Sequence, residues 1–247
     1  MKKNKKINIG RIIIGISIIM IIISLVNIII WYKDNQRNAT IKEEIEEVIN
    51  DQTNKDNEQF SVTIDFDKLK KINSDVVAYL KVNGTKINYT VVKGSDNAYY
   101  LKHNFNKEKN RSGWIFMDYH NKYDGTDKNI IIYGHNTLNG SMFGTLRNVV
   151  SNKWYMNKDN HIITLINAEE VQYYQVFSTY SIKVEDYYIT TDFKNNDEFK
   201  TFINNLKARS VYDYGVDVDG DDVILTLSTC TGNGSKRMVL HAKRIMK

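Results

Sequence analysis

The longest apolar run of the chain lies near its N-terminus. Residues 12–31 form a run of 20 without a charged side chain, rich in isoleucine. At a rise of about 1.5 Å per residue, a helix of this length spans the hydrocarbon core of a bilayer, which is about 30 Å thick. The run predicts a transmembrane helix, with Trp31 and Tyr32 at the outer interface, where amphipathic rings settle.

The residues before this run predict its orientation. Residues 1–11 carry four lysines and one arginine and no acidic side chain. Because positive charge favours the cytoplasmic side, we predict a cytoplasmic N-terminus at 1–11, a signal anchor at 12–32 and the rest of the chain outside the cell. A cleaved signal peptide is the alternative, but the run exceeds the usual apolar region of about 7–15 residues and no small-x-small cleavage site follows it.

A polar stalk is predicted at residues 33–65. Within it, Thr40-Ile-Lys-Glu43 matches a capping box, which indicates the start of a helix at Thr40. Apolar side chains follow at helical spacing, so we expect a short amphipathic helix that packs on the domain or lies near the membrane. These side chains are Ile41, Ile45, Val48 and Ile49.

The domain at residues 66–247 has mostly the period of strands. Eight short β-branched or aromatic segments with turn residues between them predict a barrel or a sandwich, with flanking helices. The segments are 76–82, 87–92, 114–117, 130–133, 162–166, 171–180, 223–227 and 238–245. Helical spacing predicts three helices, which are 67–73 (with Phe66, Leu69 and Ile72 on one side), 142–149 and 197–208 (with Phe199, Phe202, Ile203 and Leu206).

The charge balance argues against a nucleic-acid partner. The net charge is +5, and residues 1–11 account for all of it, which leaves 29 basic and 29 acidic side chains in the remainder. A neutral ectodomain has no excess of positive charge to attract phosphates. One cysteine and five scattered histidines show no zinc-ligand spacing, so we predict neither a metal nor a cofactor.

The single cysteine, Cys230, stands at the end of an apolar strand. If the last two predicted strands are antiparallel and joined by residues 231–236, Cys230 and Arg237 face each other, with Cβ atoms about 4.5–5.5 Å apart. Strand alternation puts Cys230 on the more polar face with Thr226 and Ser228, so the pair would flank a groove. A neighbouring cation raises the thiolate fraction. The alternative is a buried thiol that acts as a small hydrophobe.

A nucleophilic cysteine also needs an acid and base, and histidine has a suitable pKa. Five histidines compete for this role: His103, His120, His135, His161 and His241. His135 is favoured because it follows the buried-strand run 129–134 and so leaves a rigid element at an edge. His120, after residues 116–119, has nearly the same context and stays the second candidate.

Together these residues resemble the sortases. The resemblance rests on Leu227-Ser-Thr-Cys230 with Tyr133-Gly-His135 upstream, Arg237 downstream and an N-terminal anchor. It covers about residues 66–247, and further segments resemble class B. These are Asp96-Asn97 before Tyr99-Tyr-Leu101, Gly113-Trp-Ile-Phe-Met-Asp118, Met142-Phe-Gly-Thr-Leu146 and the helix before the cysteine strand.

The resemblance implies an eight-stranded barrel with an N-terminal helical part, and a transpeptidase on the outer face of a Gram-positive membrane. It implies that Cys230 attacks the threonyl carbonyl of a C-terminal sorting signal and forms a thioacyl enzyme. His135 would protonate the departing amine, Arg237 would hydrogen-bond substrate or oxyanion, and a cell-wall peptide or its lipid-linked precursor would supply the incoming amine. The implied groove residues are Asn97, Leu101, Tyr133, Ser228 and Thr229.

Two departures from the family pattern bear on specificity. The loop at 231–236 is short, and Thr90 stands where many sortases have proline. Two other functions compete with the sortase hypothesis. A papain-like peptidase or amidase would place its cysteine at a helix start, before its histidine, which is the opposite of the order here. A membrane-anchored binding module would need no reactive thiol.

Overall fold

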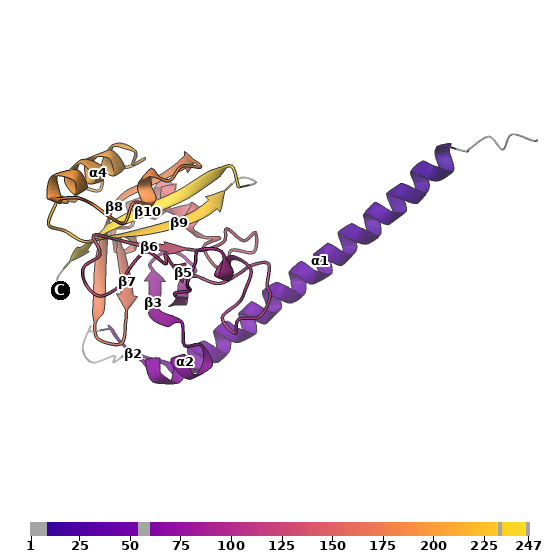
Figure 1. The fold of residues 1–247 in the computed structure, drawn as a ribbon, viewed down its shortest axis with the longest axis horizontal. Helices are drawn as coiled ribbons and strands as arrows, with labels where there is room; N and C mark the ends of the chain where they lie inside the picture. The colour runs from indigo at the N-terminus through magenta and orange to yellow at the C-terminus, as the bar shows by residue number, and fades with distance from the viewer. Residues whose placement is uncertain (1–8, 54–59, 232–233, 246–247) are drawn as a thin grey trace, which may run out of the picture.

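One long helix and a closed barrel make up most of the described chain (Figure 1). The computed structural model describes residues 9–53, 60–231 and 234–245, and the backbone alone at 9, 50–53, 60–63, 230 and 231. Short 3-10 helices connect several strands; they are η1 (Tyr99–Leu101), η2 (Leu146–Val150), η3 (Lys158–His161) and η4 (Tyr187–Ile189).

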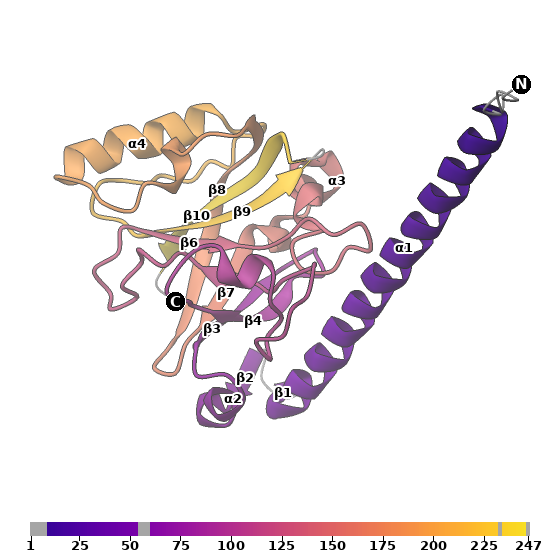
Figure 2. The same cartoon turned by 45° about the vertical axis from the view of Figure 1, so that its right-hand side comes forward.

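Helix α1, Ile9–Val48, is a single helix of 40 residues whose N-terminal half stands clear of the barrel (Figures 1 and 2). Its apolar side chains are exposed there, with Ile12 at 49% and Ile14 at 61%. The helix is long and apolar enough to cross a membrane. Exposure of so many isoleucines on all sides is typical of a segment whose solvent is lipid.

The C-terminal part of α1 packs on the domain. Ile41 and Ile45 are buried in the main core, which confirms that the apolar stripe contacts the domain. The predicted helix start at Thr40 is wrong, because Thr40 lies inside α1. Residues 33–39 contain neither proline nor glycine, so the preceding helix continues through the capping-box sequence.

A small hairpin and a short helix connect α1 to the barrel. Strands β1 (Ile49–Thr53) and β2 (Phe60–Ile64) pair antiparallel, and the polar sequence of β1 gave no strand signal. Helix α2, Phe66–Ile72, begins where the Asp65 carboxylate accepts a hydrogen bond from the Lys68 N–H at 2.8 Å. Placing Ile72 on its buried side was wrong, since Ile72 is 50% exposed.

Eight strands close into a barrel in the order β10-β8-β7-β3-β4-β5-β6-β9. All eight predicted strands are confirmed. Because the first and last strands of this order also pair, the sheet is a barrel and not a sandwich. The pairs β4–β5 and β6–β9 are parallel and the other six are antiparallel. The strands are β3 (Val76–Val82), β4 (Asn88–Val92), β5 (Phe116–Met117), β6 (Asn129–Tyr133), β7 (Ile162–Ile166), β8 (Val171–Lys183), β9 (Ile224–Thr231) and β10 (Lys236–Ile245).

Buried apolar side chains of the described residues form two clusters. One fills the barrel and extends to α1 and α2, and the other lies between the barrel and helix α4, Asn196–Ala208. The second cluster confirms the predicted helix at 197–208. Its members on α4 pack against Phe177 of β8 and Val239 of β10. Helix α4 thus covers the outer side of these strands (Figure 2). The buried side chains of α4 are Phe199, Phe202, Ile203 and Leu206.

The helix predicted at 142–149 is wrong in position. Met142 has a φ of +48°, outside the helical region, and the first helical turns come later, in η2 and in α3 (Asn152–Met156). A Cβ on Gly144 would lie 2.4 Å from the Thr137 carbonyl oxygen, so the chain turns tightly here. The turn at Met142 and Phe143 and the following 3-10 helix η2, with Leu146 and Val149, bury these four side chains, which reproduces the spacing of one α-helix.

His241, on β10, is fully buried in a chain of hydrogen bonds between the barrel and the α4 layer. The Thr226 hydroxyl donates to Asn129 Oδ1 at 2.6 Å, so it accepts from His241 Nδ1 at 2.9 Å. The Tyr180 hydroxyl donates to the remaining nitrogen, Nε2, at 2.9 Å. This arrangement holds the imidazole neutral, and burial lowers its pKa to about 3.

Acid is therefore expected to destabilise the fold through His241. Between the unfolded-state pKa of about 6.5 and the folded-state value, only the unfolded chain binds the proton, so the free energy of unfolding falls as the pH falls. Urea unfolding of wild type and His241→Gln at pH 7 and pH 5 should differ in this loss by about 2 kcal/mol. Equal losses in the two proteins would show that His241 does not carry this dependence.

Candidate active site

The hairpin of β9 and β10 places Cys230 opposite Arg237. The register runs without a shift from Lys236 opposite Thr231 to Lys243 opposite Ile224. The register prediction is therefore confirmed. The Cys230 side chain lies outside the described part of the structure. The Arg237 guanidinium donates from Nη1 to the carbonyl oxygens of Gly234 at 3.0 Å and Lys236 at 3.3 Å.

Strand β6 brings His135 to the same end of the barrel. It pairs parallel with β9, Tyr133 opposite Ser228, and the Gly134 N–H donates to the Ser228 carbonyl at 3.3 Å. Glycine is needed at 134 because a Cβ there would lie 2.4 Å from Ile115 Cδ1. The chain thus leaves β6 between packed side chains and places His135 just beyond the strand end.

Among the described residues, a hydrogen bond to the Leu101 carbonyl orients the His135 ring. Its Nε2 lies 2.8 Å from the carbonyl oxygen of Leu101. Because a carbonyl only accepts, Nε2 carries a hydrogen, and Nδ1 is the ring nitrogen left to exchange a proton with another group.

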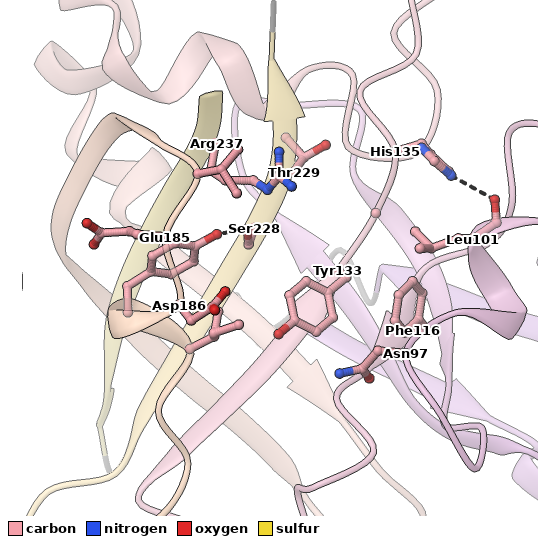
Figure 3. A pocket seen from close by; sticks show the side chains of 14 residues that line it. Asn97, Leu101, Phe116, Tyr133, His135, Glu185, Asp186, Ser228, Thr229 and Arg237 are labelled. Atoms are coloured by element: carbon pink, nitrogen blue, oxygen red, sulfur yellow. Dashed lines mark hydrogen bonds between the residues drawn. The ribbon is translucent and has the colours of Figure 1, made fainter. Parts of the chain in front are cut away.

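Leu101, His135 and Arg237 line one pocket of about 250 Å³ (Figure 3). Arg237 and Thr229 lie on one side of it, His135 and Leu101 on the other, and Tyr133 lies between them. Seven of the eight site residues predicted from the sequence line this pocket. They are Asn97, Leu101, Tyr133, His135, Ser228, Thr229 and Arg237, and the eighth, Cys230, is described by its backbone alone.

The segment after β8 supplies a wall of the pocket that the sequence interpretation missed. The Tyr188 and Ser228 hydroxyl oxygens lie 2.9 Å apart, which ties η4 to β9. This contact also covers the polar face of β9, where Thr226 and Ser228 are buried. The further lining residues are Phe116, Gly134, Val184, Glu185, Asp186, Tyr188 and Ile189.

The buried carboxylate of Asp118 holds two of the lining side chains. Asp118 is 2% exposed, and its Oδ2 accepts from Asn97 Nδ2 at 2.9 Å and from the Tyr133 hydroxyl at 2.8 Å. Burial, and next the charge of Asp118, raise the pKa of Tyr133, so the hydroxyl stays protonated as a donor. Asp118 ends the Gly113–Asp118 segment, but its sequence position gave no signal of this role.

Asp118→Asn is expected to weaken peptide binding. It removes the negative charge that fixes Asn97 and Tyr133, and the loss of a hydrogen bond to a buried charged group costs about 1–3 kcal/mol. We expect KM for the sorting peptide that the resemblance to the sortases implies to rise roughly tenfold, while kcat changes little. The matched control is Asp127→Asn, because Asp127 accepts only from loop groups outside the pocket. An unchanged KM in Asp118→Asn would contradict this positioning.

His120, the second candidate for the acid and base, lies outside this pocket. Its side chain is 54% exposed, and its Nδ1 lies 2.8 Å from Asp118 Oδ1. Thr90, the departure on β4, is buried and also does not line the pocket. Among the described residues no group of three histidine, cysteine or carboxylate side chains is placed to bind a metal ion.

The barrel and its pocket define a known class of enzyme. The sortase domain family model matches residues 80–245, so the chain belongs to the sortase family, whose members are cysteine transpeptidases. The class is B: sortase B of Listeria monocytogenes is 36% identical over 221 residues, which cover 87% of each chain.

Solved structures agree with this assignment. The chain is similar to a Staphylococcus aureus sortase B–substrate complex, with 33% identity, a TM-score of 0.69 and coverage of 87% of this chain and 94% of that one. It is also similar to a sortase B complexed with triglycine, with 38% identity, a TM-score of 0.69 and coverage of 73% and 85%. The papain-like and non-catalytic alternatives are therefore set aside.

Proposed function

We propose that Cys230 is the nucleophile of the transpeptidation, His135 its acid and base, and Arg237 a hydrogen-bond donor to substrate or oxyanion. The observation that carries this proposal is the register of β9 and β10, with Cys230 opposite Arg237 beside the pocket that His135 also lines. The nearby guanidinium favours the thiolate, which is the reactive form of cysteine.

The first half of the reaction forms the acyl enzyme. His135 Nδ1 takes the proton of the Cys230 thiol, and the thiolate adds to the threonyl carbonyl of the sorting signal. The negative charge passes to the carbonyl oxygen, to which Arg237 donates. The C–N bond then breaks as His135 transfers the proton on Nδ1 to the leaving amine. A thioester of Cys230 remains, and His135 is neutral with Nε2 still bonded to Leu101.

The second half reverses these steps with a new amine. The incoming amine adds to the thioester while His135 Nδ1 takes its proton. The C–S bond breaks and the thiolate is regenerated. That related structures are a complex with substrate and a complex with triglycine supports a peptide sorting signal and an amine as the two substrates. We propose a cell-wall peptide, or its lipid-linked precursor, as the source of the amine.

We also propose that α1 anchors the enzyme in the membrane of a Gram-positive cell. Residues 1–11 would be cytoplasmic, 12–32 the anchor, 33–65 the stalk and 66–247 the extracellular catalytic domain. The exposed isoleucines of α1 support this topology. Protease added to intact cells would then digest the catalytic domain.

The experiment that tests the function is incubation of the detergent-solubilised chain with a library of sorting-signal peptides, with and without candidate amines, followed by mass spectrometry. Cleavage at one motif with an amine adduct is the expected result. Cleavage with no adduct for any amine would contradict transfer, and no cleavage of any sorting motif would contradict the substrate class.

A further inference from the structure

A polar segment at residues 108–113, named here the clasp, joins the anchor helix to the pocket. Its central contact is a reciprocal pair of amides, in which Asn110 Nδ2 donates to Asn38 Oδ1 at 2.9 Å and Asn38 Nδ2 lies 3.3 Å from Asn110 Oδ1. Asn38 Nδ2 also donates to the Gly113 carbonyl oxygen at 3.2 Å. Asn38 is 3% exposed, so these bonds are made away from water and hold a defined geometry.

Further hydrogen bonds extend the clasp along α1 toward its apolar half. The Arg111 N–H donates to Asp34 Oδ2 at 3.1 Å, and the Ser112 hydroxyl donates to Asn35 Oδ1 at 3.2 Å. The Arg111 guanidinium reaches Asn27 Oδ1 at 2.9 Å, inside the apolar run. Five polar residues of α1, spread over three turns, bind this one segment. They are Asn27, Asp34, Asn35 and Asn38, together with Arg37, whose Nε lies 3.3 Å from Glu108 Oε2.

The other side of the clasp lies against η1, which forms part of the pocket wall. The Asn110 N–H donates to the Lys102 carbonyl, and the Trp114 N–H donates to the Tyr100 carbonyl, both at 2.9 Å. Gly113, with a φ of +55°, packs so closely that a Cβ would lie 2.3 Å from the Tyr100 carbonyl oxygen and 3.0 Å from that of Leu101. The Gly113–Trp114 peptide, whose carbonyl Asn38 holds, is thus hydrogen-bonded through the Trp114 N–H to the Tyr100 carbonyl, in the peptide that precedes Leu101.

The Leu101 carbonyl is the group that orients the His135 ring. A continuous path therefore runs from Asn38 through the Gly113–Trp114 peptide to the Tyr100 carbonyl, and along the chain to the Leu101 carbonyl and the imidazole. We propose that Asn38 is a positioning residue: through the clasp, the membrane-anchor helix holds the carbonyl that fixes the tautomer and orientation of His135. The consequence for turnover rests on the proposed role of His135, whereas the structural coupling does not.

The test uses the full chain in detergent micelles, with Asn38→Ala as the variant. The imidazole ring nitrogens of His135 are observed by NMR after ¹⁵N-histidine labelling, and kcat and KM are measured against pH. We expect the ring signals to move toward a mixture of tautomers and kcat to fall by about tenfold to a hundredfold with KM unchanged, because the base is misplaced and the peptide groove is intact.

The matched control is Ile45→Val, a buried position on the same helix whose side chain belongs to the main apolar core. It should lower stability while leaving the His135 signals and kcat as in wild type. Asn35→Ala removes the Ser112 contact, together with a hydrogen bond to the Trp31 carbonyl within α1. It keeps the test available if Asn38→Ala does not fold, and the same changes, but smaller, are expected.

The two proposals fail in different ways. His135 signals in Asn38→Ala that match those of wild type would overturn the positioning role, whatever the turnover. Signals that move while kcat stays at the wild-type value would support the coupling and overturn the catalytic role of His135.

Discussion

Cys230→Ala is expected to lower peptide cleavage and transfer by at least about 10⁴-fold and to leave no acylated enzyme. Without the thiol no covalent intermediate can form, and the rest of the pocket only binds the peptide. The measurement is intact-protein mass spectrometry after mixing with a sorting peptide, in which the wild type gains the mass of the acyl fragment and the variant does not.

The control for this variant is its fold. Main-chain pairing sets the β9–β10 register, so circular dichroism and the melting temperature should stay near those of wild type. Cleavage by Cys230→Ala at the wild-type rate would refute the nucleophile assignment.

His135→Ala is expected to lower kcat/KM by about 10²–10⁴-fold, the usual range for loss of a general acid and base. The leaving amine would depart unprotonated, and the incoming amine would attack with its proton in place. Steady-state kinetics with a sorting peptide measure this loss.

His120→Ala is the matched control, because this second histidine is outside the pocket. We expect its kcat/KM to stay within about threefold of wild type, as is usual for an exposed side chain. Added imidazole should partly restore His135→Ala and have no effect on His120→Ala. The reverse ranking of the two variants would exchange their assignments.

The local pattern of apolar and polar residues predicted most of the fold, because each strand can be identified from a few consecutive residues. The β-branched segments at Val76–Val82 and Ile162–Ile166 match their strands residue for residue. The predictions that were wrong concern segments whose local sequence pattern fits two different structures. Thr40 begins a capping-box sequence, but the helix that precedes it continues through this sequence. Met142 belongs to a compact turn in which the buried residues have a helix-like spacing.

The residues of the site also fall into a group that the sequence predicted and a group that it did not. The positioning role of Asp118 was not predicted, because a single aspartate is expected at the surface. Only the pairing of β5 with β6, with Phe116 opposite Tyr133, brings its carboxylate under the pocket. The wall formed by Tyr188 belongs to a long connection between β8 and β9 whose path has no local signal.

The sequence by itself determined that Cys230 and Arg237 face each other, because a short connection between two strands sets their register locally. Only the tertiary structure decided that His135 lies across the pocket from them. That placement depends on the parallel pairing of β6 with β9, strands separated by about 90 residues, and on a carbonyl from η1. Such long-range pairings leave no periodic trace in the chain, since they arise only when the barrel closes and buries its faces together.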